Sequence, residues 1–243
     1  MAFAAHTAEQ VLFSHMACRE DADIDLGVCA LVLSNWDYPG IDVGHYLGRL
    51  DAFADIAADI ARREEGDHPK LRALNRTLFE HLGFRGNQDR YYDTKNSFLN
   101  EVIDRRLGIP ISLSVLYIEV GRRLGLDLVG LNFPGHFLVR HDDGDGIVVI
   151  DPFHLGMTLA ADDLELRLRR ARGRKAELSE EHLAPATKHD ILTRMLANLM
   201  AIYRRAGDTR RTIEVLERLV LLNPTDDQLT GKLDELRGKT DTN

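Results

Sequence analysis

Residues 108–124 read GIPISLSVLYIEVGRRL, and this stretch decides the fold. Pro110 suits the first position of a helix, because a first-turn residue needs no amide hydrogen, and Gly108 ends the helix before it. The residues that follow are apolar almost all the way round for three turns, and polar character returns at Arg122 and Arg123. We therefore expect this helix to lie in the middle of a hydrophobic core.

Upstream of this helix, the sequence predicts further helices. Apolar residues recur at three- and four-residue steps over residues 23–63, and the break at Tyr38-Pro39-Gly40 divides that stretch into two helices. The same periodicity predicts helices over 69–82 and 96–106. Residues 1–90 therefore form a predicted helical N-terminal region.

Downstream, the periodicity changes from helix to strand. Short runs of β-branched and aromatic residues, separated by Pro134-Gly135 and by a hairpin turn, predict strands over 128–133, 136–141 and 147–151. A helix is predicted next, over 159–171. Residues 91–184 therefore form a predicted α+β core, in which the buried helix packs against a sheet.

The last part of the chain is predicted to be helical again. Helices over 191–205, 210–222 and 228–236 are joined by short turns, and the positions of small and apolar residues resemble a tetratricopeptide-like hairpin. A single hairpin of this kind needs neighbours to bury its faces. Residues 185–243 therefore form a predicted C-terminal region that packs on the rest of the chain.

Charge and composition exclude several classes of partner. The 243 residues carry a formal net charge of −8, which opposes binding to nucleic acid and to anionic membranes. No helix-turn-helix with a basic recognition helix is apparent. No apolar run reaches the roughly 18 residues of a membrane span. We expect no nucleic-acid partner and no membrane partner.

The cysteines and the N-terminus indicate the compartment. Cys18 and Cys29 are too few for a disulfide framework, and their spacing does not fit a zinc site. The first residues lack the basic segment of a signal peptide. We expect a cytoplasmic protein.

One histidine and one aspartate follow the buried helix in the order expected of a catalytic pair. His136 follows Gly135 at the expected start of a strand, and Asp151 ends the next strand. In papain-like and transglutaminase-like enzymes, a nucleophile at the N-terminus of a core helix precedes a histidine base and an acid that orients it. The order of buried helix, His136 and Asp151 is compatible with that arrangement.

Two longer runs make the resemblance more specific. The run NSFLNEVIDRRLGIPISLS over residues 96–114 and the run PGHFLVR over residues 134–140 resemble the SirB family of bacterial proteins. The resemblance extends over roughly residues 24–236. It implies a transglutaminase-like core followed by tetratricopeptide-like helices, and it implies no settled activity.

The sequence departs from active transglutaminase-like enzymes at the nucleophile. The position of their cysteine falls near residues 110–112, where this chain has no cysteine, and Cys29 lies in an apolar stretch expected to be buried. Ser112 is the hydroxyl residue of that first turn. It would need a well-placed base to attack a carbonyl, and the favoured interpretation is a serine bonded to backbone groups of the first turn.

Other polar residues flank the expected cleft. Asn100 and Glu101 are candidates for lining it with hydrogen-bonding groups, and Tyr92 for forming an apolar wall, although structural roles are favoured for this set. We expect no metal site and no cofactor. Since the nucleophile is missing, we predict a peptide- or protein-binding module. The alternative is an acyl-transfer or amide-hydrolysing enzyme that uses Ser112, His136 and Asp151.

Overall fold

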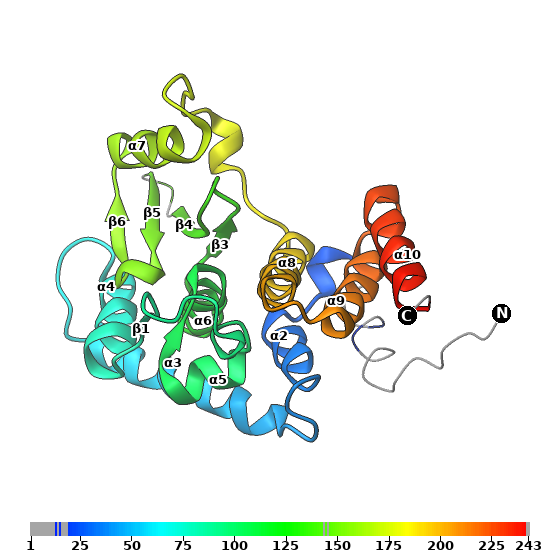
Figure 1. Cartoon of the computed structure of the whole chain (residues 1–243). Coiled ribbons are helices and arrows are strands. Elements are labelled where there is room, and N and C mark those ends of the chain that lie inside the picture. Colours follow the sequence, from blue (N-terminus) through cyan, green and yellow to red (C-terminus); the bar gives the residue numbers. More distant parts are fainter. Residues whose placement is uncertain (1–12, 14, 16–18, 143, 145, 242–243) are drawn as a thin grey trace.

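A computed structural model describes residues 13, 15, 19–142, 144 and 146–241, and Figure 1 shows how its elements are arranged. In the first half of the described chain, the structure is mainly helical. The helices run in the order α2 (Leu26–Ser34), α3 (Val43–Ala61), α4 (Pro69–Asn75), the π-helical turn η2 (Arg76–His81), α5 (Leu99–Arg105) and α6 (Pro110–Arg123). The predicted break at Tyr38-Pro39-Gly40 lies between α2 and α3, as expected.

A four-stranded antiparallel sheet follows α6. Its strands are adjacent in chain order: β3 (Leu128–Leu131), β4 (Leu138–Asp142), β5 (Ile147–Asp151) and β6 (Met157–Leu159). In this sheet Val139 pairs with Ile150, and both side chains face the core that contains α6. Leu138 and Val149 point to the other face, where they pack with α7 (Ala161–Arg172). The alternation of side chains along each strand thus places one helix on each face of the sheet.

Helix α6 is the centre of the molecule, as its sequence predicts. Every residue from Pro110 to Gly121 is buried, including Glu119, which forms ion pairs with Arg122 and Arg123. A short parallel pair precedes the helix, because β1 (Arg85–Gly86) lies beside β2 (Leu107–Gly108). This pair was not predicted, since two residues show no periodicity.

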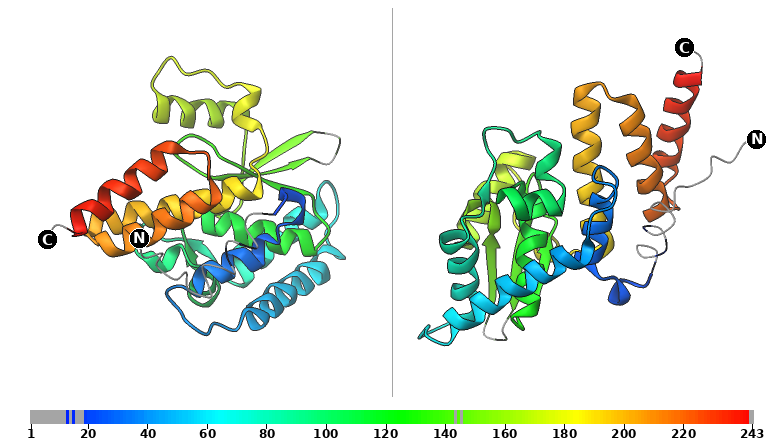
Figure 2. Two further views of the ribbon diagram at one scale, coloured as in Figure 1. Left: turned by 90° about the vertical axis from the view of Figure 1, so that its right-hand side faces the viewer. Right: turned by 90° about the horizontal axis from the view of Figure 1, so that it is seen from below.

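The C-terminal region consists of α8 (Lys188–Ala206), α9 (Thr209–Leu222) and α10 (Asp227–Asp241). Figure 2 shows these three helices beside one another on the side of the molecule away from the strands. One hydrophobic core includes residues of α2, α6, α8 and α9, so it crosses the three predicted regions 1–90, 91–184 and 185–243. The domain division and the tetratricopeptide-like character of these helices stay predictions.

A hydrogen bond and two cation–π contacts connect α9 to Trp36, which follows the end of α2. The indole nitrogen of Trp36 donates a hydrogen bond of 2.8 Å to Glu214, and the guanidinium carbons of Arg218 and Arg211 lie 4.1 and 5.0 Å from the Trp36 ring centroid. Such cation–π contacts add to the apolar packing beneath them. Among the described helices, none has the length and apolar character needed to cross a bilayer.

Candidate functional site

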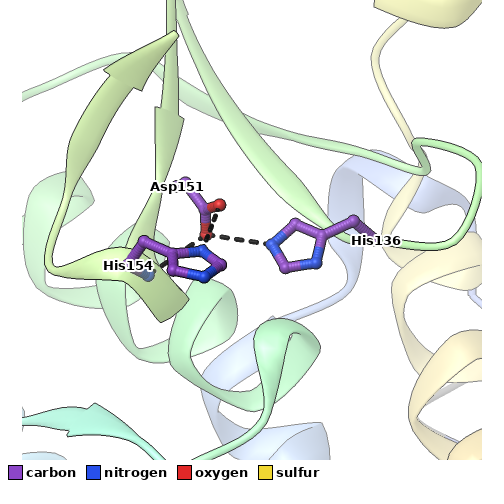
Figure 3. Close-up of side chains that lie close together, drawn as sticks. All are labelled: His136, Asp151 and His154. Atoms are coloured by element: carbon purple, nitrogen blue, oxygen red, sulfur yellow. Dashed lines mark hydrogen bonds and ion pairs between the residues drawn. The ribbon is translucent and has the colours of Figure 1, made fainter. Parts of the chain in front are cut away.

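The structure brings His136 and Asp151 together. The Nε2 atom of His136 lies 3.0 Å from Oδ1 of Asp151, whose side chain is fully buried at the end of β5 (Figure 3). His136 lies in a bend and not at the start of a strand as predicted, because the turn at Pro134-Gly135 continues through it: its amide donates to the Phe133 carbonyl, and β4 begins two residues later.

A second histidine binds the same carboxylate. The Nδ1 atom of His154 lies 2.7 Å from Oδ2 of Asp151, and the amides of Phe153 and His154 donate to Oδ1 at 3.1 and 3.3 Å. Asp151 thereby caps the short 3₁₀ turn η4 (Pro152–His154). Our sequence interpretation missed His154. The signal was present, because a capping aspartate brings the residue three positions later towards its own carboxylate.

Arg167 of α7 completes the surroundings of Asp151. Its Nη2 atom lies 3.0 Å from Oδ2 of the aspartate. Burial alone would raise the pKa of Asp151, but the hydrogen bond and charge of His136, followed by those of His154, lower that pKa to about 2. An ionised carboxylate only accepts hydrogen bonds, so the contacting nitrogens of both imidazoles carry protons. The Nδ1 atom of His136 therefore has an open lone pair when the ring is neutral.

The same three residues are a geometric candidate for holding a metal ion. Among the described residues, His136, Asp151 and His154 offer ligand atoms that all lie within 4.8 Å of one another. The donor set does not fit a divalent cation well. Both oxygens of Asp151 are already saturated by imidazole, amide and guanidinium donors, and a cation would have to displace the positive charge of Arg167. The arrangement is that of a carboxylate that orients two imidazoles.

Ser112 lies in the first turn of α6, which packs against η4. Its Oγ donates to the Asn96 carbonyl at 2.6 Å and accepts from the Ile109 amide at 3.1 Å, and the residue is fully buried. No hydrogen bond joins Ser112 to His136 among the described residues. The serine therefore occupies the structural position favoured by the sequence, bonded to backbone groups, and its proposed role as a nucleophile has no supporting contact.

The thiol of Cys29 is fully buried in α2. Burial, followed by the charge of Asp25, raises the pKa of Cys29 to about 11, which suppresses the reactive thiolate. Cys18 lies outside the described residues.

The other predicted site residues lie in a polar network before α6. Asn100 is buried, and its Oδ1 has no hydrogen-bond partner among the described residues. Glu101 lies 3.8 Å from Lys95 and 4.0 Å from Arg105. Tyr92 is 52% exposed. No hydrogen bond or ion pair connects these three residues to His136 within the described chain, so their roles in lining a cleft stay predictions.

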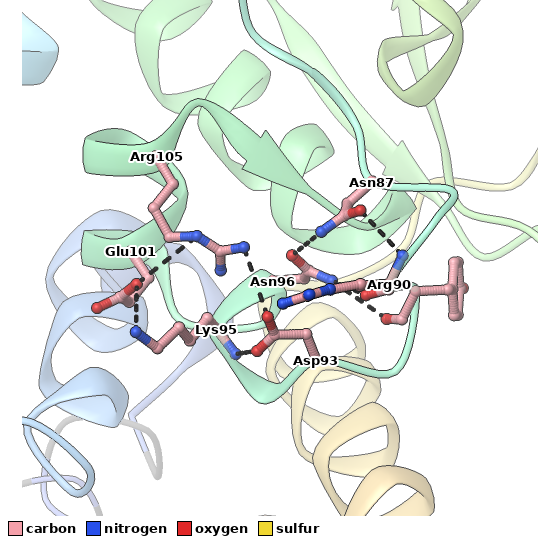
Figure 4. Close-up of polar contacts among 8 residues, drawn as sticks. Asn87, Arg90, Asp93, Lys95, Asn96, Glu101 and Arg105 are labelled. Carbon is pink, nitrogen blue, oxygen red and sulfur yellow. Dashed lines mark hydrogen bonds and ion pairs between the residues drawn. The ribbon is translucent and has the colours of Figure 1, made fainter.

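Hydrogen bonds hold the loop that carries Tyr92 in place. Asn87 donates to Asn96, which in turn donates to the Arg90 carbonyl, at 2.9 and 2.7 Å, and Arg105 lies 3.5 Å from Asp93 (Figure 4). The loop thus has a defined path from β1 to α5 without secondary structure of its own for most of its length.

Comparisons with known proteins agree with this geometry. A family model described as the transglutaminase-like superfamily matches residues 44–197, which include α6, His136, Asp151 and His154. The order of a buried helix, a histidine and an aspartate in contact agrees with the arrangement expected of this class, with the histidine in the bend before β4 and the aspartate at the end of β5.

Curated relatives cover most of the chain. A UPF0162 protein of Xylella fastidiosa (strain Temecula1) is 39% identical over 216 residues, which are 88% of this chain and 77% of the relative. A UPF0162 protein of Pseudomonas aeruginosa is 32% identical over 196 residues, which are 80% of this chain and 71% of the relative. The chain belongs to the transglutaminase-like superfamily and, within it, to the UPF0162 family.

A eukaryotic protein shares part of the chain. F-box only protein 21 of Mus musculus is 35% identical over 145 residues, which are 56% of this chain and 22% of that protein. No solved structure matched the chain. The bacterial relatives bear the UPF0162 name, so the SirB name rests on the sequence resemblance alone.

Proposed function

We propose that this chain is a cytoplasmic protein that binds a peptide or a protein partner at the surface around His136 and that it does not catalyse acyl transfer. One observation carries the proposal: the Oγ of Ser112 is buried and bonded to backbone groups, so His136 has no nucleophile in hydrogen-bond contact among the described residues. The imidazole and carboxylate then form a polar network that fixes the loop before β4.

The proposed binding surface is supported by exposed aromatic area near the network. Tyr91 and Tyr92 are 36% and 52% exposed, and the ring centroid of Tyr91 lies 6.3 Å from that of Phe153. The Phe153 centroid in turn lies 6.0 Å from that of His136. Tyrosine gives a large contact area with little loss of side-chain freedom, which suits the recognition of a partner.

A display selection with random peptides on the full chain tests the binding function. The selected peptides are expected to bind the parent and to bind Tyr92→Ser at least about tenfold more weakly, because an anchor aromatic is lost. Ile147→Ser is the matched control, since Ile147 is 46% exposed on β5. Failure to select any peptide, or equal weakening by both substitutions, would contradict the proposal.

The second candidate is an acyl transferase or amide hydrolase that uses Ser112, His136 and Asp151. The contact of 3.0 Å between His136 and Asp151 favours it, because the carboxylate holds the imidazole in one tautomer. Incubating a peptide-amide library with the parent and with His136→Ala separates the two functions. We expect identical background rates, whereas turnover by the parent that disappears in the variant would establish the enzyme.

A further inference from the structure

Two tyrosines of the loop before α5 and two arginines of α8, from distant parts of the chain, carry aromatic and positively charged groups on neighbouring elements. We call Tyr91, Tyr92, Arg194 and Arg205 the tyrosine–arginine patch. The guanidinium carbon of Arg205 lies 4.5 Å from the ring centroid of Tyr92. The ring centroids of Tyr91 and Tyr92 lie 5.3 Å apart, and burial raises the pKa of Tyr91, which the positive charge of Arg194 lowers. The loop before α5 and helix α8 therefore form one surface.

The patch is continuous with the imidazole–carboxylate network. Arg194 donates a hydrogen bond of 3.0 Å from Nη1 to Asn132, which lies in the segment leading to His136. On the other side, the ring of Phe153 lies between Tyr91 and His136, with centroids 6.3 and 6.0 Å away. A ligand on the patch would therefore lie within reach of the proposed binding surface.

The patch carries positive charge in a chain whose formal net charge is −8. Within the described residues, neither Arg194 nor Arg205 has a carboxylate partner, and Arg205 is exposed. The acidic groups nearest to the two arginines in sequence cap helices, since Asp190 accepts from the Thr187 amide and Asp208 from the Arg211 amide. Guanidinium groups with open donors recognise carboxylates strongly.

The spacing of the two arginines defines the shape of the ligand. They are eleven residues apart on α8, which places them on the same face of the helix, about 16 Å apart along its axis. An extended peptide rises about 3.3 Å per residue, so about five residues span that distance. The tyrosine rings offer an apolar surface for a side chain between the two charges.

We propose that the tyrosine–arginine patch binds an acidic extended peptide, with carboxylates about five residues apart against Arg194 and Arg205 and an apolar side chain on Tyr91. The inference rests on the proposed function, because it names the kind of peptide that the surface around His136 takes.

The test is a chemical-shift titration of the isotope-labelled full chain with three N-acetylated, C-amidated hexapeptides: EGSFGE, its neutral analogue QGSFGQ and its basic analogue KGSFGK. We expect the acidic peptide to bind at least about tenfold more tightly than the neutral one. Arg194→Gln and Arg205→Gln are expected to remove that preference. Arg174→Gln, which changes an exposed arginine in the loop after α7, is expected to preserve it.

The outcomes separate the inference from the function on which it rests. Equal affinity of the parent for acidic and neutral peptides contradicts the acidic ligand, and loss of the preference in Arg174→Gln contradicts its assignment to the tyrosine–arginine patch. Either result leaves peptide binding itself intact. If inorganic phosphate binds more tightly than the acidic peptide, the patch is a phosphate site, and the proposal that it recognises peptide carboxylates is wrong. If none of the three peptides changes the chemical shifts at millimolar concentration, both the inference and the proposed function are contradicted.

Discussion

His136 and His154 contact different oxygens of one buried carboxylate, and their ring centroids lie 5.8 Å apart. Asp151 therefore orients two imidazoles at once, while Arg167 balances its charge. The open nitrogens are Nδ1 of His136 and Nε2 of His154, which have no hydrogen bond within the described residues. This network is the polar centre of the site, and its stability depends on the ionisation of a single residue.

Acid should weaken the fold through Asp151. Its pKa in the folded state is about 2, below the ordinary value of 3.8, so its stabilising effect is complete above that ordinary value and disappears as the pH falls towards 2. Between about pH 5 and about pH 2, the parent should lose about 2 kcal/mol more of its free energy of unfolding than Asp151→Asn does. Urea unfolding of both proteins at several pH values measures the difference, and parallel pH profiles would refute it.

Removing the Ser112 hydroxyl should cost stability. Ser112→Ala leaves the Asn96 carbonyl and the Ile109 amide without their hydrogen bonds to Oγ, which is expected to lower the free energy of unfolding by about 1–3 kcal/mol. Ser114→Ala is the matched control, because the Oγ of Ser114 is buried with no partner among the described residues. Chemical denaturation should show a small change for the control, and equal losses would contradict the prediction.

A methyl group at residue 86 should disturb the site. A Cβ on Gly86 would lie 2.6 Å from two atoms of the Phe153 ring, which also contacts His136 and His154. Gly86→Ala should therefore lower the free energy of unfolding by about 1–3 kcal/mol through overpacking. Gly48→Ala, in open space on α3, should instead stabilise the protein by up to about 1 kcal/mol. Chemical denaturation of both variants measures whether the free energy of unfolding falls in Gly86→Ala and rises in Gly48→Ala.

The thiol of Cys29 should be unreactive in the folded protein. In a Cys18→Ser background, an aromatic disulfide reagent is expected to label Cys29 only after denaturation, because burial raises the pKa of the thiol to about 11. The absorbance of the released thiolate measures the rate. Rapid labelling of the native protein that slows in His136→Ala would instead place a thiol in the site and contradict the non-catalytic proposal.

The helices could be predicted from the sequence because periodicity and helix-ending residues act locally. Pro110 begins α6 where the sequence places it, and the turn at Pro39-Gly40 separates α2 from α3. The short elements were missed. β6 has three residues and β1 has two, so their pairing depends on partners far along the chain.

The candidate site was only partly predictable. The contact of His136 with Asp151 was expected from the order of the strands, but the bend at His136 depends on a hydrogen bond of its amide to Phe133. His154 and Arg167 were missed, because one depends on the 3₁₀ turn after β5 and the other on how α7 packs across the sheet. The turn at His154 is local and its capping signal is in the sequence, whereas tertiary packing, which a single sequence does not display, decides the position of Arg167.

Trp36 is the sole tryptophan of the chain, and it lies where α9 meets the end of α2. Its ring centroid also lies 6.1 Å from that of Tyr203 on α8, so its emission is an intrinsic reporter of the contacts with α8 and α9. Detachment of the last helices would hydrate the indole and shift its fluorescence to longer wavelength, so such a detachment could be followed in the unlabelled protein. The molecule thus carries its own optical probe at the contact of Trp36 with α9.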